Sequence, residues 1–353
     1  MKLPLVSIII VNYNGYQFLK NCLSSILKNT YSNYEIIVAD NGSTDQSVSK
    51  IKKDFSQESK IFFIELKKNI GPSAARNEAF KIAKGEFIGF LDNDTQVDKN
   101  WIKEAVKLFQ KNPKIGIIQS KLLLLDHPDR IDYVGELIGN LGFLKSIGNY
   151  GEIDKNQYSK NHLVLAAKSA GMFIRSTAFI KSDQFDPDYF IFMEETDLGW
   201  RVWMTGFKNI FCPKSIVYHK FSSSRKIMDK DFHNYLLRFH GCKNYIQTLI
   251  KNLSTKNLIK IVPVHIFLWF SLATFLVIIG DFKSAKNIYR GIFWVFKNLK
   301  KILNKRKIIQ SKRTLTDQKL FKDYHLMIKT SFFFYFKNFF ASHKKVVSLE
   351  EKI

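Results

Sequence analysis

The chain has 353 residues, of which 46% are hydrophobic, so it can bury one large core or two smaller ones and is not expected to be disordered. Its formal net charge of +24 is uneven, because the residues from Arg225 to Ile353 hold 26 Lys and Arg against 7 Asp and Glu. Three cysteines without a Cys-x-x-Cys pair indicate neither a disulfide framework nor a zinc knuckle, and they fit a reducing, cytoplasmic location.

The first part of the chain alternates β-branched runs with helical patterns, which predicts an α/β fold with a largely parallel sheet. The first apolar run leads into polar residues without a cleavage site, so we interpret it as a buried strand and not as a signal peptide. Strands are expected at Leu5 to Val11, Glu35 to Ala39, Ile61 to Leu66 and Phe87 to Leu91. Helices are expected around Phe18 to Leu27, from Pro72 to near Gly85, and from about Asn100 to Lys111.

Three polar runs directly follow the carboxyl ends of predicted strands, and ligands of open α/β sheets bind at these ends. They are Asn12-Tyr13-Asn14, the run from Asp40 to Asp45, and Asp92-Asn93-Asp94. Because the carboxyl ends of parallel strands meet at one edge of a sheet, these runs are expected to surround one cleft.

The second half of this region is less regular. From about Asp126 to Asn161 the pattern loosens into Gly, Asn, Asp and Tyr, which we interpret as a variable insertion that contacts an acceptor. A buried strand is then expected near Met172 to Ile174 and a helix around Glu194 to Thr205. The run Ser222-Ser223-Ser224 marks the expected boundary between residues 1–224 and a C-terminal region, 225–353.

The C-terminal region is predicted to be helical, at about Lys230 to Ile250, Leu258 to Ile279 and Phe282 to Lys307. Residues 261–279 contain no charged side chain and are just long enough to cross about 30 Å of hydrocarbon, although Pro263 and His265 weaken that interpretation. The segment after it is amphipathic and basic, as interfacial helices are. An anionic membrane surface is therefore the expected partner. The chain is expected to bind it through a segment within about 258–307, either peripherally or as a single membrane-spanning helix.

The pair Asp92 and Asp94 offers two carboxylates just past a strand, and oxygen ligands of this kind suit Mg²⁺ or Mn²⁺. By itself the run Asp92-Asn93-Asp94 fits a solvated turn better than a metal site. The run that begins at Asp40 also fits a turn with a helix cap at Thr44 or Asp45.

A second acidic cluster, Glu194, Glu195 and Asp197, opens a predicted helix. A carboxylate there can serve as a general base, or the cluster can simply complement the positive end of the helix dipole. Trp200 and Trp203 on the same helix are candidates for stacking on an acceptor sugar, with core packing the expected role of at least one of them.

Five of these motifs, in this order, resemble those of the family 2 inverting glycosyltransferases, in particular the rhamnosyltransferase-like branch. The resemblance covers about residues 4 to 222. It rests on these segments: Val11 to Asn14, Val38 to Asp45, Asn69-Ile70-Gly71 with Ala75-Arg76-Asn77, Gly85 to Asp94, and Met193 to Leu198 through Tyr218-His219.

The resemblance implies a GT-A fold, which is a Rossmann-like, mixed and mostly parallel sheet flanked by helices, with a helical, basic and apolar C-terminal extension. It also implies a divalent metal and a donor such as a dTDP- or UDP-sugar. The implied donor-binding residues are Asn12, Tyr13, Asn14, Asp40, Arg76, Asp92 and Asn93. The implied metal ligands are Asp94, Asp92 and His219.

The resemblance also implies a general base in the acidic cluster. Similar enzymes carry Glu-Asp-x-Asp there, and the Asp of their Glu-Asp pair acts as the base. Glu195 stands at that position in this chain, so Glu195 is the first candidate base. Asp197 is the second candidate, and Glu194 is the third.

The function expected from the resemblance is transfer of a sugar, such as rhamnose, to a surface-glycan acceptor that is lipid-linked, at the cytoplasmic face of the cell membrane. Two alternatives stay open: transfer to a polyprenyl phosphate, and a non-catalytic nucleotide-sugar-binding scaffold of a polysaccharide complex. A nucleic-acid partner is not expected, because the basic residues accompany apolar helices of the kind that bind membranes.

Overall fold

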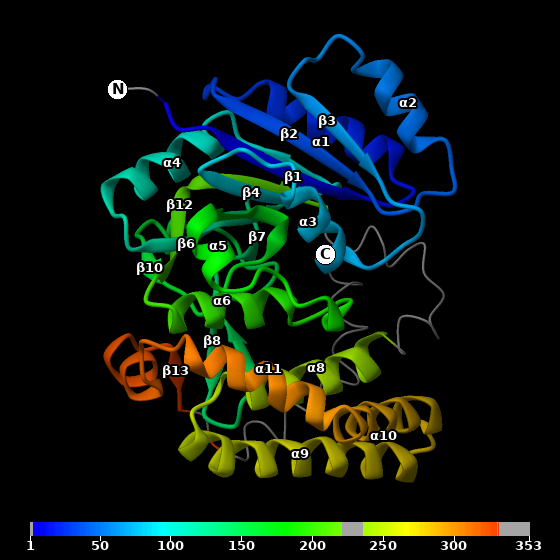
Figure 1. Cartoon of the computed structure of the whole chain (residues 1–353), viewed down its shortest axis with the longest axis vertical. Coiled ribbons are helices and arrows are strands. Elements are labelled where there is room, and N and C mark those ends of the chain that lie inside the picture. Colours follow the sequence, from blue (N-terminus) through cyan, green and yellow to red (C-terminus); the bar gives the residue numbers. More distant parts are fainter. Residues whose placement is uncertain (1–2, 221–235, 330, 332–353) are drawn as a thin grey trace. The chain divides into compact units, whose positions relative to one another are not determined.

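The computed structural model describes residues 3–220, 236–329 and 331, which fall into two compact units (Figure 1). The first unit comprises Met1–Glu136 and Ser146–Lys226, and the second comprises Leu137–Lys145 and Ile227–Ile353. The serine run predicted as the boundary lies outside the described residues. The short segment 137–145, inside the predicted insertion, belongs to the second unit.

The first unit is built on a mixed ten-stranded sheet with the order β10-β12-β6-β11-β4-β1-β2-β3, to which β5 adds beside β12 and β7 beside β6. The strands are β1 (Val6–Asn12), β2 (Tyr34–Asp40), β3 (Ile61–Glu65), β4 (Phe87–Asp92), β5 (Thr95–Val97), β6 (Ile115–Leu124), β7 (Ile131–Tyr133), β10 (His162–Leu163), β11 (Met172–Arg175) and β12 (Lys208–His219). Strands β4, β1, β2 and β3 are parallel, and β11 lies antiparallel between β4 and β6. The predicted α/β class with a mostly parallel sheet is confirmed.

Helices cover both faces of this sheet (Figure 1). They are α1 (Tyr16–Leu27), α2 (Ser47–Asp54), α3 (Pro72–Phe80), α4 (Trp101–Lys111), α5 (Ser176–Lys181) and α6 (Glu194–Met204). Helices α1, α2 and α4 bury their apolar stripes in one cluster, and α3, α5 and α6 bury theirs in another. Buried apolar area on both faces is the dominant stabilising term for such a layered fold.

Helix α3 and strand β6 are the clearest differences from the sequence-based expectation in the first unit. Helix α3 ends at Phe80 instead of near Gly85, because the next three residues form tight i to i−3 hydrogen bonds in place of α-helical ones. Strand β6 was not predicted, yet all ten of its residues are buried between β12 and β11. A strand buried on both faces lacks the alternating pattern that marks a half-exposed strand.

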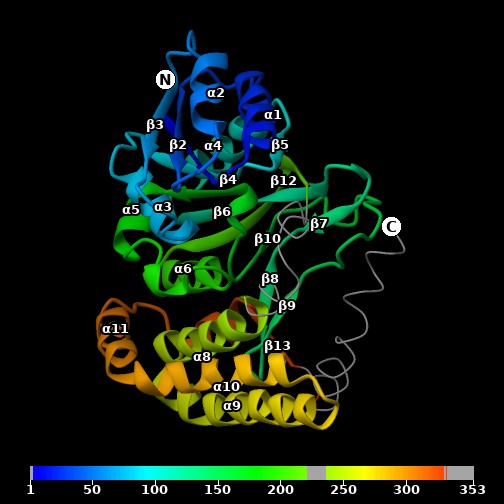
Figure 2. The ribbon, with the colours of Figure 1, turned by 90° about the vertical axis from the view of Figure 1, so that its right-hand side faces the viewer.

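The second unit contains four α-helices and a small sheet among its described residues (Figure 2). The helices are α8 (Gly241–Asn252), α9 (Thr255–Ile278), α10 (Phe282–Lys297) and α11 (Leu299–Ser311), with π-helical turns at Leu236–His240 and Lys319–Asp323. The sheet has the order β13-β8-β9, formed by β8 (Glu136–Gly139), β9 (Leu144–Ser146) and β13 (Met327–Ile328).

The predicted tail helices are present with changed boundaries. The helix expected over 282–307 is broken at Asn298, which ends α10 and begins α11 and donates from Nδ2 to the carbonyl of Trp294 at 2.8 Å. Pro263 lies inside α9 without ending it. The first six residues of the helix expected from Lys230 lie outside the described residues.

The segment 137–145 packs against α8 and α9 within the second unit. The Phe143 ring lies 4.1 Å from that of His265, and Gly142 adopts a φ of +85° against Leu249, where a side chain would clash. Nε1 of Trp269 donates to Nε2 of His265 at 3.0 Å, so Nδ1 of His265 carries the hydrogen that is donated to the Leu141 carbonyl at 2.9 Å. These contacts fix one stripe of α9 as interior.

Helix α9, Thr255–Ile278, is the one helix in the described part of the chain that is long and apolar enough to cross a membrane. Length and composition alone do not separate a spanning helix from the core helix of a soluble protein.

Candidate active site

The carboxyl ends of β1, β2 and β4 bring the three polar runs to one edge of the sheet. The parallel register pairs Asn12 with Asp40 and Val11 with Asp92, so the strands end at the same level. The runs therefore surround the position where ligands gather in open α/β sheets.

The side chain of Asn12 connects all three runs. It is fully buried, and its Nδ2 donates to Oδ1 of Asp40 at 3.1 Å while its Oδ1 accepts from Nδ2 of Asn93 at 3.0 Å. Gly15 leaves room for this meeting, because a Cβ at that position would collide with Asn93. Buried polar groups are costly unless they are satisfied, so this network holds the loops in one arrangement.

The remaining donor-site candidates of the first two runs differ in exposure. Asp40 is buried and accepts a hydrogen bond from the backbone N–H of Ser43 at 2.9 Å. Asn14 has a left-handed φ of 51°, and its Oδ1 accepts from the backbone N–H of Thr44 at 2.8 Å. Tyr13 is 47% exposed. Its ring is thus open to stack on a flat ligand, while the neighbouring groups shape the loops.

Asp92, Asp94 and His219 form a group whose ligand atoms all lie within 4.8 Å of one another. Asp92 ends β4, Asp94 follows two residues later, and His219 ends β12, which pairs with β5 through Thr95. Nε2 of His219 lies 3.5 Å from Oδ1 of Asp94. Two carboxylate oxygens and an imidazole nitrogen suit a divalent cation such as Mn²⁺, so these residues fit the metal that the sequence implied.

The ring of His219 is held from its other side by Asp132 of β7. Nδ1 of His219 lies 2.8 Å from Oδ2 of Asp132, and Nζ of Lys168 lies 4.0 Å from the other oxygen of that carboxylate. Burial lowers the pKa of His219, but hydrogen bonds to Asp132 and Asp94 outweigh burial and raise it to about 10. A carboxylate behind the imidazole is the arrangement that orients metal-binding histidines.

Arg76 of α3 joins the edge of the sheet to the acidic cluster. It is 3% exposed, and its guanidinium lies 2.8 Å from Oδ1 of Asp92 and 3.9 Å from Oε1 of Glu194. Burial raises the pKa of Asp92, an effect that Arg76 opposes and Asp94 reinforces. Burial, followed by the charge of Glu195, raises the pKa of Glu194 well above its usual value.

The three acids that open α6 have different surroundings. Asp197 is fully buried and forms an ion pair with Arg201, 2.9 Å from Nε and 2.8 Å from Nη2. Glu194 is buried beside Arg76. Glu195 is only half-buried, and its Oε1 accepts from the backbone N–H and the hydroxyl of Ser169 at 3.1 and 2.5 Å. The structure thus gives Asp197 an internal cationic partner, whereas Glu195 is the one acid of the three that is not fully buried.

The loop before α6 carries backbone strain. Phe190, Phe192 and Met193 have φ values of 58°, 67° and 69°, in the left-handed region that non-glycine residues avoid. A Cβ on Gly71, just before α3, would collide with Phe190. Strain of this kind persists where the surrounding structure imposes it, most often at functional sites.

Trp200 and Trp203 are both fully buried, so neither stacks on an acceptor sugar as was considered from the sequence. Nε1 of Trp203 donates to the carbonyl of Val164 at 2.9 Å, which satisfies the indole in the core.

Sequence reasoning missed three residues near the site: Asp132, Lys168 and Ser169. Asp132 lies in the stretch interpreted as a variable insertion. The short run Ile131-Asp132-Tyr133 could have been interpreted as a buried strand with one inward charge, which is unusual enough to mark a functional residue.

The described sheet, mixed, mostly parallel and flanked by helices on both faces, is the GT-A fold that the motifs implied. A mannosyltransferase from Pyrobaculum calidifontis, solved in complex with GDP-Man and Mn²⁺, shares this fold with a TM-score of 0.52 and 13% identity, over 88% of this chain and 86% of that one.

Residues 7–172, somewhat less than half of the chain, match the family model described as Glycosyl transferase family 2. An uncharacterized glycosyltransferase of Haemophilus influenzae is 30% identical over 149 residues, which is 40% of this chain and 60% of the relative. A chondroitin synthase of Escherichia coli is 24% identical over 260 residues, which is 72% of this chain and 35% of the relative. The chain thus spans less than two thirds of the length of either relative.

Proposed function

We propose that this protein transfers a sugar from a nucleoside-diphosphate sugar to a hydroxyl group of a glycan acceptor, with inversion at the anomeric carbon. The observation that carries the proposal is the meeting of two groups at one edge of the sheet. One is the set Asp92, Asp94 and His219, which fits a cation, and the other is the half-buried carboxylate of Glu195. The two groups are joined through Arg76, whose guanidinium lies 2.8 Å from Asp92 and 3.9 Å from Glu194, the residue before Glu195.

Asp94 and His219, with Asp92 beside them, would hold a Mg²⁺ or Mn²⁺ ion. When bound, such an ion neutralises the negative charge that develops on the leaving diphosphate. Asp132 holds the His219 ring so that Nε2 faces the site. Arg76 holds Asp92 from the protein side and adds positive charge near the donor.

Glu195 is the proposed general base. The acceptor hydroxyl gives its proton to this carboxylate while its oxygen bonds to the anomeric carbon on the face opposite the departing nucleoside diphosphate. The bond electrons of the breaking C–O bond leave with the diphosphate. Oε1 of Glu195 accepts two hydrogen bonds from Ser169. Oε2 of Glu195 has no hydrogen-bond partner in the described part of the chain, so this oxygen is available to the acceptor hydroxyl.

The donor side is proposed from the loops. Tyr13 would stack on the base, and Asn12, Asn14, Asp40 and Asn93 would shape the nucleotide pocket. Because the motif series resembles rhamnosyltransferase-like enzymes, dTDP-rhamnose and UDP-sugars are the first donors to test.

The second unit supports a location at the cytoplasmic face of a membrane and a lipid-linked acceptor. From Thr255 to Ser311 there are 11 Lys and Arg and a single acid, Asp281, on helices that also expose large apolar side chains. Each basic residue near an anionic surface contributes about 1 kcal/mol of attraction.

The deciding experiment uses the purified full chain and a panel of dTDP-, UDP- and GDP-sugars, with and without Mn²⁺. Binding is measured by thermal shift and turnover by release of nucleotide, first without an acceptor and then with membrane extract. We expect one donor to stabilise the protein only with Mn²⁺, and Asp94→Asn to abolish that effect.

Asp129→Asn is the matched control, since Asp129 is an exposed acid outside the site. Donor binding without any turnover would support a non-catalytic scaffold instead. Transfer onto free polyprenyl phosphate, and not onto a lipid-linked saccharide, would identify polyprenyl phosphate as the acceptor.

A further inference from the structure

A cavity of about 890 Å³ lies in the second unit, formed by the first turns of α9 and the segment that follows α11. Four lysines line it: Lys256 and Lys260 from α9, Lys322 from the π-helical turn, and Lys329 from just after β13. Phe321 adds an apolar patch to the wall. Cavities of this size accommodate small ligands, and this one is positive.

The four lysines have no acidic partner within the described ranges, and all four are exposed. A lysine run along one helix is commonly just a solvated face. Here the lysines come from three separate segments and converge on one cavity, where like charges repel one another. An anion bound among them removes that repulsion.

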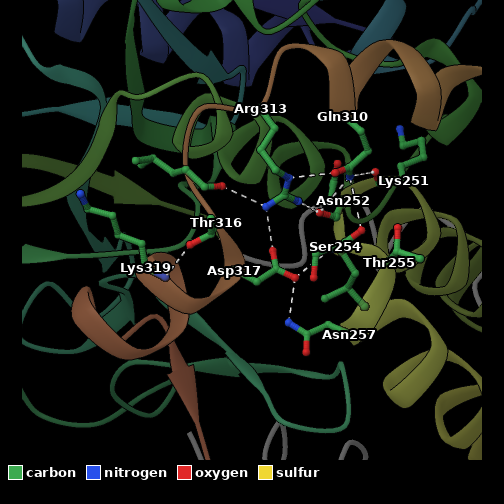
Figure 3. Close-up of polar contacts among 12 residues, drawn as sticks. Lys251, Asn252, Ser254, Thr255, Asn257, Gln310, Arg313, Thr316, Asp317 and Lys319 are labelled. Atoms are coloured by element: carbon green, nitrogen blue, oxygen red, sulfur yellow. Dashed lines mark hydrogen bonds and ion pairs between the residues drawn. The ribbon is translucent and has the colours of Figure 1, made fainter.

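The one acid in the cavity wall, Asp317, is already neutralised. Figure 3 shows its carboxylate between Arg313, Ser254 and Asn257. Nη1 of Arg313 lies 2.8 Å from Oδ1, and Oδ2 accepts from the backbone N–H of Ser254 and from Nδ2 of Asn257, each at 2.8 Å. Asp317 is 3% exposed, so it fixes the start of α9 and does not offset the lysines.

The cavity opens at one end of an apolar stripe on α9. Lys256 and Lys260 share the exposed side of this helix with Ile259, Phe267 and Phe270; Phe267 follows Lys260 by seven residues, which is two helical turns. The opposite stripe is buried and includes His265 and Trp269. One side of α9 is therefore interior, and the other is an apolar surface that begins at the lysines.

Helix α10 extends this surface. The hydroxyl of Tyr289 lies 3.1 Å from that of Thr274, and its ring packs edge-on against Phe270 at 5.5 Å. On α10, Phe293 and Phe296 follow Tyr289 by four and seven residues, which places them on the same side, and both are more than half exposed. An exposed apolar patch of this kind marks an interaction surface, and its basic surroundings favour an anionic bilayer.

We propose that this cavity binds the phosphate group of a membrane lipid whose acyl chains lie along the apolar side of α9 and α10. The helices then lie in the plane of one leaflet. The inference rests on the membrane location proposed above and adds a specific headgroup site to it. The lysines supply charge and N–H donors to the phosphate oxygens, and Phe267 and Phe270 reach the hydrocarbon.

The test measures binding of the full chain to phosphatidylcholine vesicles that contain either phosphatidic acid, a phosphate monoester, or phosphatidylglycerol, a diester, at matched surface charge. The site variant is Lys260→Gln with Lys322→Gln. The control is Lys286→Gln with Lys297→Gln, which removes the same charge from exposed positions of α10 outside the cavity. We expect the wild type to prefer phosphatidic acid by about fivefold or more, in line with the attraction of one additional lysine.

The site variant should lose that preference, and the control should keep it while binding both vesicles more weakly. An equal preference in all three proteins, or an equal loss in both variants, would overturn the proposal. So would soluble pyrophosphate that binds as tightly as the vesicles do, since the ligand would then not be a lipid. Release of nucleotide from the donor without vesicles reports the first unit separately, so failure of either proposal is recognised independently.

Discussion

Oδ2 of Asp132 lies 2.8 Å from Nδ1 of His219, although 87 residues separate the two along the chain. Burial raises the pKa of Asp132, but Lys168 and His219 outweigh burial and lower it, so the carboxylate stays ionised behind the imidazole. His219 in turn faces Asp94. The proposed metal-binding set, Asp92, Asp94 and His219, is therefore supported by a residue that no sequence motif marks.

Asp132→Asn should weaken Mn²⁺ binding by about tenfold to a hundredfold, because the ring of His219 loses the carboxylate that orients it. The amide keeps the size of the side chain, so the fold should be preserved. Calorimetric titration of Mn²⁺ measures the change, with Asp129→Asn as the control. Unchanged affinity in Asp132→Asn would mean that Asp132 only fills space.

Glu195→Gln should lower kcat by about a hundredfold to ten-thousandfold, because the acceptor proton then has no base. Donor affinity should change little, since Glu195 bonds to Ser169 and not to the donor loops. Steady-state transfer assays with a thermal shift for the donor separate the two effects. Glu58→Gln, an exposed acid of the same unit, is the control. A normal kcat in Glu195→Gln would remove this residue from the mechanism.

Asp197→Asn should mainly destabilise the protein. Arg201 is 3% exposed, and removing its partner leaves a buried charge unpaired, which costs about 3–5 kcal/mol. Urea unfolding should therefore shift to a lower midpoint, whereas kcat per folded molecule should stay near that of the wild type. A stable but inactive variant would instead return Asp197 to the list of candidate bases.

The second unit should become less stable in mild acid because of His265. Burial lowers the pKa of this histidine to about 4, with a smaller opposing effect from the hydrogen bond to Leu141. Between pH 6.5 and 4 the unfolded chain binds a proton that the folded one refuses, so stability falls as the pH falls, by about 3 kcal/mol over the whole window. Protonation would also set an Nε2–H against the indole N–H of Trp269.

Hydrogen exchange of α8 and α9 at pH 7.5 and pH 5 checks this expectation. His265→Gln should flatten the pH dependence, and His127→Gln, on a surface loop of the first unit, should leave it intact. An equally steep dependence in His265→Gln would assign the acid sensitivity to other groups.

Local patterns predicted the elements that carry the site because hydrophobic periodicity and turn chemistry act over a few residues. The strands that end at Asn12, Asp40 and Asp92 were predicted to within a residue or two. Local patterns gave no prediction for β6, because burial on both faces removes the alternation of apolar and polar residues. They also placed the end of α3 too late, because the chain tightens into turns after Phe80. The break at Asn298 was likewise invisible within a continuous amphipathic pattern.

Residue types at short spacings were enough to predict the α/β class, the ordered motif series and the basic, apolar character of the tail. The pairing of Asp197 with Arg201, the contact of Glu195 with Ser169 and the support of His219 by Asp132 became visible only in the folded chain. The fold also brings four lysines from three segments to one cavity. Such roles depend on contacts between distant parts of the chain. The role of an acidic side chain or a lysine is set by its burial and by its neighbouring charges, and residue type alone does not give it.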